Sequence, residues 1–530
     1  MENINRKMAK GSAWMILLRL VDRGLGLISM IILARLLVPA DFGLNAMAWS
    51  IIGVLDVMGS FSFDLALIHR QNSDKRHYDT AWTYTILYGL FSAVVLASIA
   101  IPTAIFYNDY RLEAIMYVLA FSKIIQSFEN IGVVAFQKEM NLRREFIFRT
   151  SKRMVAFIVT IALAVVYRNY WALVIGTVVS GLAGTIFSYF YHPFRPQFSL
   201  SGGKDLFNYS RWLLLNNIIL FANNKGSDFI IGKFAGSTAL GVYSISYEIS
   251  NLPTTELVFP ISKAVFPGYA KMAHDLVLLK KGFLDVFGVI VLCVVPVGLG
   301  ITVLAKPIVF AFLGEKWINA VEVIKILALF GIIRACISNV GSVYLALGKP
   351  KILTVVAIVY FIILLPLLFF SIPLIGAVGA AYSFLIVVSI TTPINIIIVM
   401  RLLRISLLNI VEEIWRPILS GLVMLVSVNA VGKALFHSTL QDFDWFYHLM
   451  ALINHPSLNG YIQEPMEILN KIQESLFLPS VGLLLQLPIL TLTGVLAYVS
   501  SLLFFWFISG YPLGSETMVK DLIIYKWIKK

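Results

Sequence analysis

Apolar runs long enough to cross a membrane recur along this chain of 530 residues, and most of them are joined by short connections. A helix needs about 20 mostly apolar residues to span the hydrocarbon core of a bilayer. Because 59% of the residues are hydrophobic and only 13% are charged, a bilayer solvates this chain better than water does. The pattern predicts an all-α integral membrane protein of about 14 transmembrane helices.

Fourteen segments of the sequence are predicted to be transmembrane helices. They cover 12–37, 43–68, 80–106, 112–137, 149–167, 170–190, 207–232, 238–262, 283–305, 320–346, 351–372, 376–400, 411–431 and 483–508. The first run is too long and too highly charged to be a cleaved signal peptide, so we expect a true first helix.

Basic residues support the same topology. With the N-terminus in the cytoplasm, 28 of the 42 lysines and arginines lie in the loops predicted to be cytoplasmic, in the helix ends beside them and in both termini, and 8 lie in the external loops and helix ends. Cytoplasmic loops are enriched in these residues, so we expect a multi-pass protein of the inner (cytoplasmic) membrane with both termini cytoplasmic and 432–482 external. The densest basic stretch, 137–153, is interpreted mainly as a topology anchor, with binding of anionic lipid headgroups as a second role.

The chain also repeats itself after 198 residues. The shift pairs four positions: Ser12 with Ser210, Trp14 with Trp212, Arg35 with Lys233, and Gly43 with Gly241. Six predicted helices separate the copies, so the copies share one orientation and form a parallel repeat. We expect an N-terminal six-helix lobe over 1–200, a C-terminal six-helix lobe over 201–405, and two additional helices with an external amphipathic segment over 406–530.

Motifs of several enzyme and cofactor classes are missing from the sequence. It contains no Walker A loop, no H-E-x-x-H and no G-x-S-x-G, and Cys293 and Cys336 are far from any C-x-x-C spacing. The net charge is +13, and the charged residues lie mostly between apolar runs. This distribution favours a role in membrane topology over nucleic-acid binding. We therefore expect no enzyme, no metal, no cofactor and no nucleic-acid partner.

Polar residues inside the predicted helices carry the functional signal, because each is costly in hydrocarbon unless it faces a cavity or a partner. They recur on several helices, as expected if those helices line one wet cavity. The predicted substrate-binding residues are Arg19, Arg23, Lys123, Arg334, Asn217 and Asn224, and the predicted ion-coupling residues are Asp56 and Glu248. The alternative is that neighbours such as Arg23 with Asp22, or Lys225 with Asp228, neutralise each other as structural pairs.

The segment 432–482 leaves a further alternative open. It contains His437, His448, His455, Asp442 and Asp444, which could hold a metal or a catalytic site, although the spacing is a weak ligand pattern. Interfacial amphipathic helices explain its aromatic cluster equally well.

Three motifs carry a resemblance to a known family. They are ARLLVPADFG at 34–43, ALIHRQ at 66–71 and LALGKPK at 345–351. Together with the charged first helix and the repeat, the first 430 residues or so resemble the polysaccharide exporters that include the colanic acid and teichuronic acid exporters. These are lipid-linked oligosaccharide flippases of the multidrug/oligosaccharidyl-lipid/polysaccharide superfamily.

The resemblance implies a function and partners. It implies export of a polyprenyl-pyrophosphate-linked oligosaccharide by alternating access, for the assembly of cell-surface polysaccharide such as lipopolysaccharide. The implied partners are that substrate, membrane lipids, and a polysaccharide polymerase or export machinery. The alternatives are a cation-coupled drug or small-molecule antiporter of the same superfamily, or a polytopic glycosyltransferase or ligase. The basic residues inside the helices favour an anionic substrate.

Overall fold

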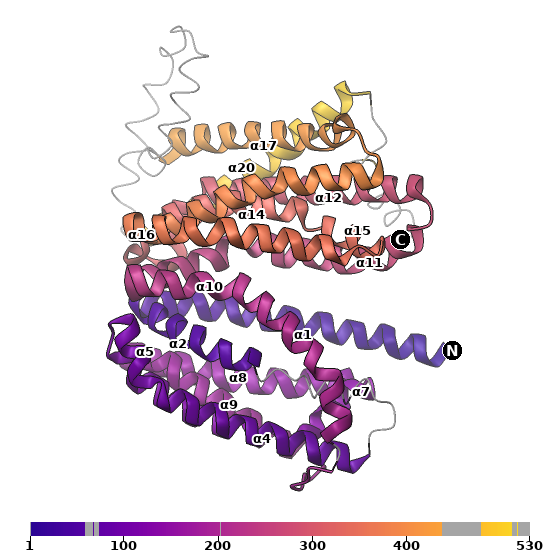
Figure 1. Ribbon diagram of the computed structural model, residues 1–530. Coiled ribbons are helices and arrows are strands. Elements are labelled where there is room, and N and C mark those ends of the chain that lie inside the picture. The colour runs from indigo at the N-terminus through magenta and orange to yellow at the C-terminus, as the bar shows by residue number, and fades with distance from the viewer. Residues whose placement is uncertain are drawn as a thin grey trace. The chain divides into compact units, whose positions relative to one another are not determined.

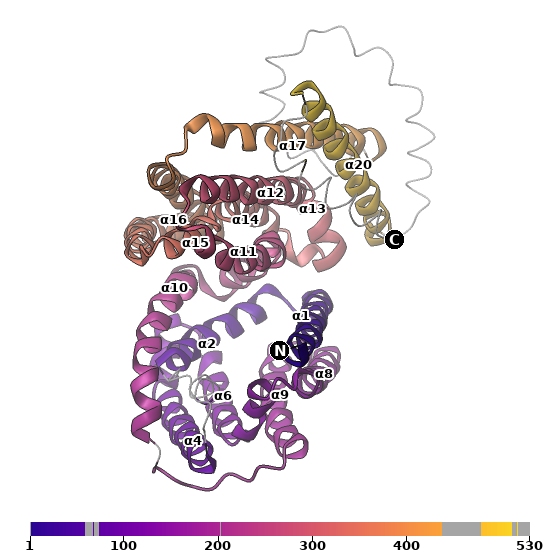
Figure 2. The same cartoon turned by 90° about the vertical axis from the view of Figure 1, so that its right-hand side faces the viewer.

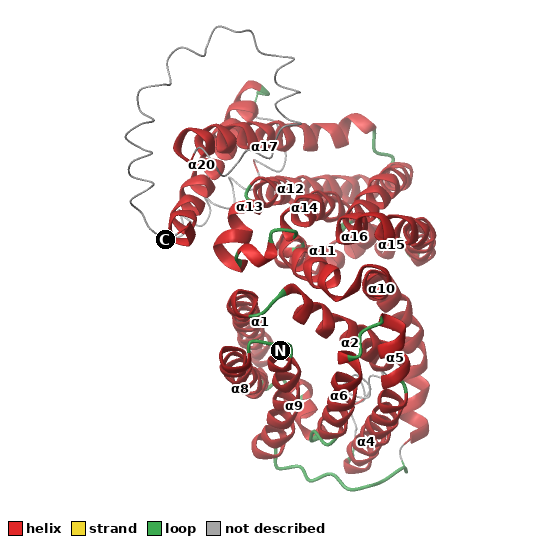
Figure 3. Cartoon of the chain, turned by 90° about the vertical axis from the view of Figure 1, so that its left-hand side faces the viewer, coloured by secondary structure: helices red, strands yellow, loops and turns green. Residues whose placement is uncertain are grey.

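Helices joined by short loops make up the part of the chain that the computed structural model describes, which is residues 2–58, 67, 74–201, 203–436, 479–510 and 517. No strand occurs in those residues (Figure 3). The predicted all-α class is confirmed. The chain divides into two compact units, Met1–Ser244 and Ile245–Lys530, called unit 1 and unit 2 below. The predicted boundaries of 1–200, 201–405 and 406–530 stay predictions.

Unit 1 is built from helices that pack in a series of pairs. α1 packs on α8, α8 on α9, α9 on α6, and α6 on α4 (Figure 2). The bounds are α1 (Glu2–Leu36), α2 (Pro39–Met58), α4 (Lys75–Ser98), α5 (Ala100–Tyr107), α6 (Arg111–Ser127), α7 (Val134–Lys138), α8 (Leu142–Tyr167), α9 (Trp171–Tyr191) and most of α10 (Gly203–Ser250).

Unit 2 places α12, α14 and α16 side by side, with α17 against α12 and α20 against α17 (Figure 1). Its helices are α11 (Phe259–Met272), α12 (Leu276–Val303), α13 (Ala305–Ile308), α14 (Ala320–Ile337), α15 (Val340–Ala346), α16 (Pro350–Leu403), α17 (Leu407–Phe436) and α20 (Pro479–Ile508). A core of Phe283, Phe287, Val291 and Tyr344, each 2% exposed or less, joins α12 to α15.

Most described residues of the predicted helix ranges are helical, although the ranges 80–106, 112–137 and 320–346 each contain a break, and backbone breaks separate neighbouring ranges. α16 is interrupted at Ile375 and Gly376, where Gly376 has φ 58°, so the predicted boundary between 351–372 and 376–400 is confirmed. The range 112–137 was predicted as one helix, and that detail is wrong. α6 ends at Ser127, and the helical stretch Ile131–Lys138 turns away by 64°, because Asn130 leaves the helical conformation at φ −69°, ψ 112°.

Eight helices of the described residues are long and apolar enough to cross a membrane, or nine if the bent pair Arg111–Ser127 and Ile131–Lys138 is one span. They include α4, α8 and α9 in unit 1 and α12 and α17 in unit 2. A protein with many membrane spans is therefore established. The count of 14 stays a prediction, since α1 carries charges such as Arg19, Asp22 and Arg23 in its interior.

α8 begins earlier than predicted. Hydrophobicity placed its start at 149, whereas the helix begins at Leu142 with Asn141 as its N-cap. The first turns are basic and so were invisible to a search for apolar runs, but Glu145 pairs with Arg149 at 2.5 Å, one turn on. Such pairs at i, i+4 stabilise a helix. Most of the stretch interpreted as a basic loop, 137–153, is therefore helix, because α8 covers 142–153.

The repeated glycines meet in unit 1. A Cβ on Gly43 of α2 would overlap the carbonyl oxygen of Ser237, and a Cβ on Gly241 of α10 would overlap the carbonyl oxygen of Pro39. The 198-residue repeat pairs Gly43 with Gly241 and Pro39 with Ser237. The contact of Gly43 with Ser237 and the contact of Gly241 with Pro39 are therefore equivalent under the repeat. α2 and the end of α10 therefore cross through a locally symmetric contact that only glycine allows.

The same motif holds the connection between α1 and α2. The buried Asp41 carboxylate accepts hydrogen bonds from the Val38 N–H and from the Tyr170 N–H, both at 3.1 Å. It thereby fixes the turn after α1 and ties it to the start of α9. Pro39, Asp41 and Gly43 of ARLLVPADFG thus have a structural explanation in this chain.

Residues 437–478, which are most of the segment 432–482, lie outside the described residues. The possible metal or catalytic site at His437, His448, His455, Asp442 and Asp444 lies there as well. It stays an untested alternative.

Candidate functional site

A cavity of about 510 Å³ lies inside unit 1, enclosed by α1, α2, α6, α8 and α9. We call it the α8 cavity. Its polar lining residues are Ser29, Asn45, Gln126, Lys152, Arg153, Thr160, Thr177 and Ser180. Hydroxyl and amide groups from five helices thus surround two cationic side chains. Such a lining suits an anionic ligand that also carries hydroxyl groups.

The two cations of the cavity differ in their partners. Lys152 Nζ forms an ion pair with Glu129 Oε2 at 3.1 Å. This pair lies against α9, where a Cβ on Gly184 would come within 2.7 Å of Lys152 Nζ. Arg153 has no carboxylate partner among the described residues, so it presents its charge to the cavity. Its Nη2 atom lies 3.6 Å from where a Cβ on Gly26 of α1 would be.

α1 carries Arg23, which was predicted to bind substrate, close to the position of Arg153. Arg23 is three residues before Gly26 and is half-buried, and residues three apart share one face of a helix. α1 and α8 pack along each other, so Arg23 and Arg153 come from neighbouring helices. Arg19, one turn earlier, is exposed.

Neutral groups of the cavity offer further hydrogen bonds. The Asn45 Oδ1 atom is buried and accepts no hydrogen bond within the described part of the chain, so it is ready to accept one from a ligand. Gln126 Nε2 donates to Ser122 Oγ at 2.9 Å, which orients the amide from α6. Trp49 adds an aromatic ring from α2.

Two predicted residues of different roles form one ion pair. Lys123 Nζ of α6 lies 2.5 Å from Asp56 Oδ1 of α2, with the two side chains 16% and 43% exposed. Lys123 was predicted to bind substrate and Asp56 to couple ions. The structure brings them together, so each neutralises the other in this state.

The helix α10 contains a second pair. Lys225 Nζ and Asp228 Oδ2 are 2.9 Å apart at i, i+3, as the structural-pair alternative predicted for these two residues. Asn217 and Asn224 lie on the same helix, but their side chains are outside the described residues.

In unit 2 the predicted Arg334 is held by aromatic residues. Its Nη1 donates to the Tyr247 hydroxyl at 2.7 Å, and its guanidinium lies 5.8 Å from the centre of the Phe330 ring. The Tyr360 hydroxyl is within electrostatic range of both Arg334 and Tyr247. We call these four residues the Arg334 cluster. Glu248, the second predicted ion-coupling residue, follows Tyr247 on α10 and is half-buried.

The sequence analysis did not single out Lys152, Arg153 or Glu129 as cavity residues. Lys152 and Arg153 lie in the predicted helix 149–167, but they were counted with the basic stretch 137–153 and interpreted as part of a topology anchor. One signal for the earlier start was Asn141, because asparagine commonly caps helix N-termini. A second was the i, i+4 spacing of Glu145 and Arg149, which is typical of a helix. Within the described ranges, no three His, Cys, Asp or Glu side chains come together as a metal site would need.

The fold and the cavity together define a class, namely a multi-span helical membrane protein with a polar cavity in unit 1. The solved lipid II flippase MurJ, in an inward closed conformation, superposes with a TM-score of 0.67 at 13% identity and covers 93% of this chain and 99% of its own. An inward-facing multidrug resistance MATE family transporter of the MOP superfamily superposes with a TM-score of 0.56 at 12% identity and covers 72% and 95%. These likenesses establish the fold.

The family follows from the sequence. The chain belongs to the polysaccharide biosynthesis protein family, whose model matches residues 32–322. The lipopolysaccharide biosynthesis protein WzxC of Escherichia coli K12 is 24% identical over 82% of this chain and 89% of its own length. The teichuronic acid biosynthesis protein TuaB of Bacillus subtilis 168 is 27% identical over 55% and 61%. The predicted resemblance to polysaccharide exporters is confirmed.

Proposed function

We propose that this protein is a flippase that moves a polyprenyl-pyrophosphate-linked oligosaccharide across the cytoplasmic membrane by alternating access, for cell-surface polysaccharide assembly. The observation that carries the proposal is the α8 cavity, where Arg153 presents positive charge among hydroxyl and amide groups. Family membership supplies the substrate class. The chemistry of the cavity matches both halves of such a substrate, because arginine can bind two phosphate oxygens at once and the neutral groups can bind sugar hydroxyls.

The predicted arginines and Lys123 belong to this proposal as substrate-binding residues. Arg23 on α1, which packs along α8, is proposed to act with Arg153 on the substrate, and Arg334 is a second cationic group in unit 2. A pyrophosphate crossing the membrane needs compensating charge, because an isolated charge in hydrocarbon is costly. Arg19, Asn217 and Asn224 remain predicted contacts along the route.

Ion coupling is proposed at the Asp56–Lys123 pair. A proton or sodium ion that binds the Asp56 carboxylate would weaken its hold on Lys123 and release an ammonium group for the substrate. Glu248 is the alternative coupling residue. We propose further that about 14 helices span the membrane in two six-helix lobes and two additional helices, with both termini cytoplasmic, because the basic loops alternate in that way.

A leaflet-accessibility assay in liposomes tests the function. Purified protein is reconstituted with a polyprenyl-pyrophosphate-linked oligosaccharide, and the glycan exposed outside is cleaved by an added glycosidase. Wild-type protein should make the inner-leaflet fraction accessible, whereas protein-free liposomes should not. Accessibility equal to that of the protein-free liposomes would contradict the proposal.

The antiporter alternative has one supporting observation, the MATE-like fold. A cavity for organic cations should present carboxylates, whereas the α8 cavity presents Arg153. Uptake of a fluorescent cation into the same liposomes separates the two functions. Gradient-driven cation uptake without glycan translocation would favour the antiporter.

A further inference from the structure

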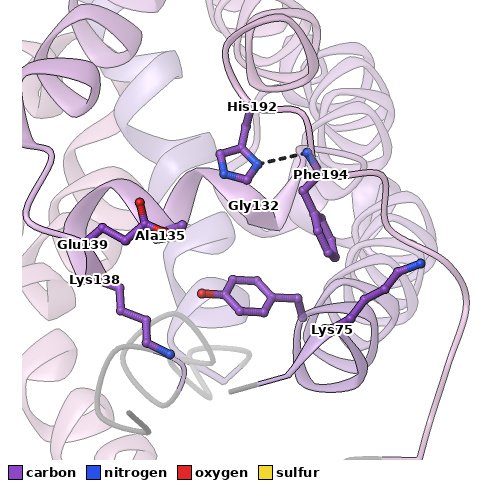
Figure 4. Close-up of a pocket in the computed structure, with 8 residues that line it drawn as sticks. Lys75, Gly132, Ala135, Lys138, Glu139, His192 and Phe194 are labelled. Atoms are coloured by element: carbon purple, nitrogen blue, oxygen red, sulfur yellow. Dashed lines mark hydrogen bonds between the residues drawn. The ribbon is translucent and has the colours of Figure 1, made fainter. Parts of the chain in front are cut away.

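A second cavity of unit 1 lies at the ends of its helices rather than inside the lobe. Its volume is about 580 Å³, and it is open on one side between the start of α4, α7 and the segment after α9. Its lining residues are Lys75, Tyr78, Gly132, Ala135, Lys138, Glu139, His192 and Phe194 (Figure 4). We call it the His192 pocket. The transport route proposed above does not use it.

The wall after α9 is a non-helical stretch, 192–200, that hydrogen bonds hold against its neighbours. Asn130 Nδ2 donates to the Phe194 carbonyl oxygen at 2.7 Å. Farther on, the Gln197 N–H donates to Asp79 Oδ1 at 2.9 Å and the Ser199 N–H donates to Thr83 Oγ1 at 3.0 Å, both on α4. The pocket is therefore a preformed feature rather than a gap beside a loose loop.

Cationic and aromatic groups share the pocket. Lys138 Nζ lies 6.0 Å from the centre of the Tyr78 ring, and the Tyr78 and Phe194 rings are 5.6 Å apart. Lys75 stands at the first turn of α4 and is exposed. Glu139 is the acidic residue of the lining, so the charged lysines outnumber it.

His192 adds a hydrogen-bond donor. Its Nδ1 accepts a hydrogen bond from the Phe194 N–H at 3.1 Å, as the dashed line in Figure 4 shows. The neutral ring must then carry its proton on Nε2, where it can donate. Burial lowers the pKa of His192, Glu139 acts to raise it, and Arg144 and Arg195 act to lower it further. An anion bound beside the ring would favour the protonated form.

The location of the pocket points to the source of that anion. It lies at the start of α4 and the end of α9, both apolar enough to cross a membrane, and this is the basic end of the helices, predicted to face the cytoplasm. Headgroups of the inner leaflet lie at this level, and anionic ones attract lysine and arginine. Tyr78 and Phe194 supply the aromatic contact typical of the interface.

We propose that the His192 pocket binds the phosphate of an acidic phospholipid headgroup of the cytoplasmic leaflet. Lys138 and the Nε2–H of His192 contact the phosphate oxygens, Lys75 adds positive charge at the rim of the pocket, and the apolar wall receives the glycerol end. Glu139 disfavours headgroups with two phosphates close together. The site is separate from the α8 cavity, so its test does not depend on the proposed transport.

Binding is measured on full-length protein in nanodiscs by native mass spectrometry of retained lipid, with phosphatidylglycerol against phosphatidylcholine. The variant Lys75→Gln with Lys138→Gln should lose the preference for phosphatidylglycerol by about tenfold. The matched control, Arg143→Gln with Lys281→Gln, removes the same charge from two exposed residues outside the pocket and should keep the preference. Equal loss in the two variants would overturn the proposal.

Two further measurements cover misfolding and the identity of the ligand. In the wild-type protein, phosphatidylglycerol should protect Lys75 and Lys138 from acetylation more than phosphatidylcholine does, while Lys281 should be modified equally in both; equal modification of the pocket lysines would refute the site without any variant. Inorganic phosphate at millimolar concentration should fail to displace the lipid. Full displacement would assign the site to a free anion instead.

Discussion

The α8 cavity of unit 1 and the Arg334 cluster of unit 2 hold positive charge in different ways. In the α8 cavity, Lys152 is neutralised by Glu129, while Arg153 beside it has no carboxylate partner among the described residues. In the Arg334 cluster, the guanidinium donates to the Tyr247 hydroxyl and lies over the Phe330 ring. A hydroxyl and a ring orient a guanidinium without cancelling its charge.

Charged residues within the helices therefore fall into two kinds, those in ion pairs and those oriented by neutral groups. Lys123 with Asp56 and Lys225 with Asp228 are ion pairs that the protein itself satisfies. Arg153 has no carboxylate partner among the described residues and faces the α8 cavity, whereas Arg334 is held by a hydroxyl and an aromatic ring. A residue's position in a predicted helix does not distinguish the two kinds, whereas its neighbours do.

The largest effect is expected at Arg153. Arg153→Glu should lower glycan translocation by about a hundredfold, because it replaces a charged hydrogen bond worth roughly 1.5–3 kcal/mol with repulsion, and 1.36 kcal/mol is tenfold in rate. The liposome accessibility assay measures this. Arg149→Glu, one turn away and facing Glu145 instead of the cavity, is the control and should retain most activity. Full activity in Arg153→Glu would remove the α8 cavity from the route.

Arg334 comes next. Arg334→Gln should lower translocation by about tenfold to thirtyfold, by loss of one charged contact, and Arg334→Lys should restore part of it because the charge remains while the planar fork is lost. Arg401→Gln, an exposed residue at the end of α16, is the control. If glutamine and lysine behaved alike at Arg334, its charge would not be what matters.

The ion pair of Lys123 and Asp56 should behave as a unit. Asp56→Asn and Lys123→Gln should each lower thermal stability, and the double variant should be less affected than the sum, with a coupling energy of at least about 0.5 kcal/mol. Transport with and without a proton or sodium gradient is then compared. A double variant whose transport still responds to the gradient would exclude Asp56 as the coupling residue and leave Glu248.

The smallest effect is expected for Tyr247→Phe. This change removes the hydrogen bond that orients Arg334 and leaves its charge, so translocation should fall by about fivefold, in line with a hydrogen bond of roughly 1 kcal/mol. The effect should vanish in an Arg334→Gln background, because the hydroxyl then has no guanidinium to orient. A loss that persists in that background would assign Tyr247 an independent contact with the substrate.

Local sequence predicted those features that depend on residue type and spacing. The break between 351–372 and 376–400, the pairing of Lys225 with Asp228 and the resemblance carried by ARLLVPADFG are confirmed. Each follows from neighbours within a few turns. The bend of 64° after α6 was missed although Ser127, Glu129 and Asn130 interrupt the apolar run there, because polar residues inside the predicted helices were interpreted as cavity-lining residues.

The sequence by itself determined that this chain lies in a membrane, that it is helical and which family it belongs to, because hydrophobic length and local motifs are properties of the chain. Only the tertiary structure decided which charges are paired. Lys123 and Asp56 are 67 residues apart in the sequence and form an ion pair between two helices. Lys152 pairs with Glu129 and not with Glu145, which is nearer in sequence and lies on the same helix. Arg153 gained its place in the α8 cavity through the packing of α8 on α1 and α9. Within the membrane, the partners of a charged side chain come from the helices packed around it. The arrangement of those helices depends on contacts between distant segments, so no single segment of the sequence predicts it.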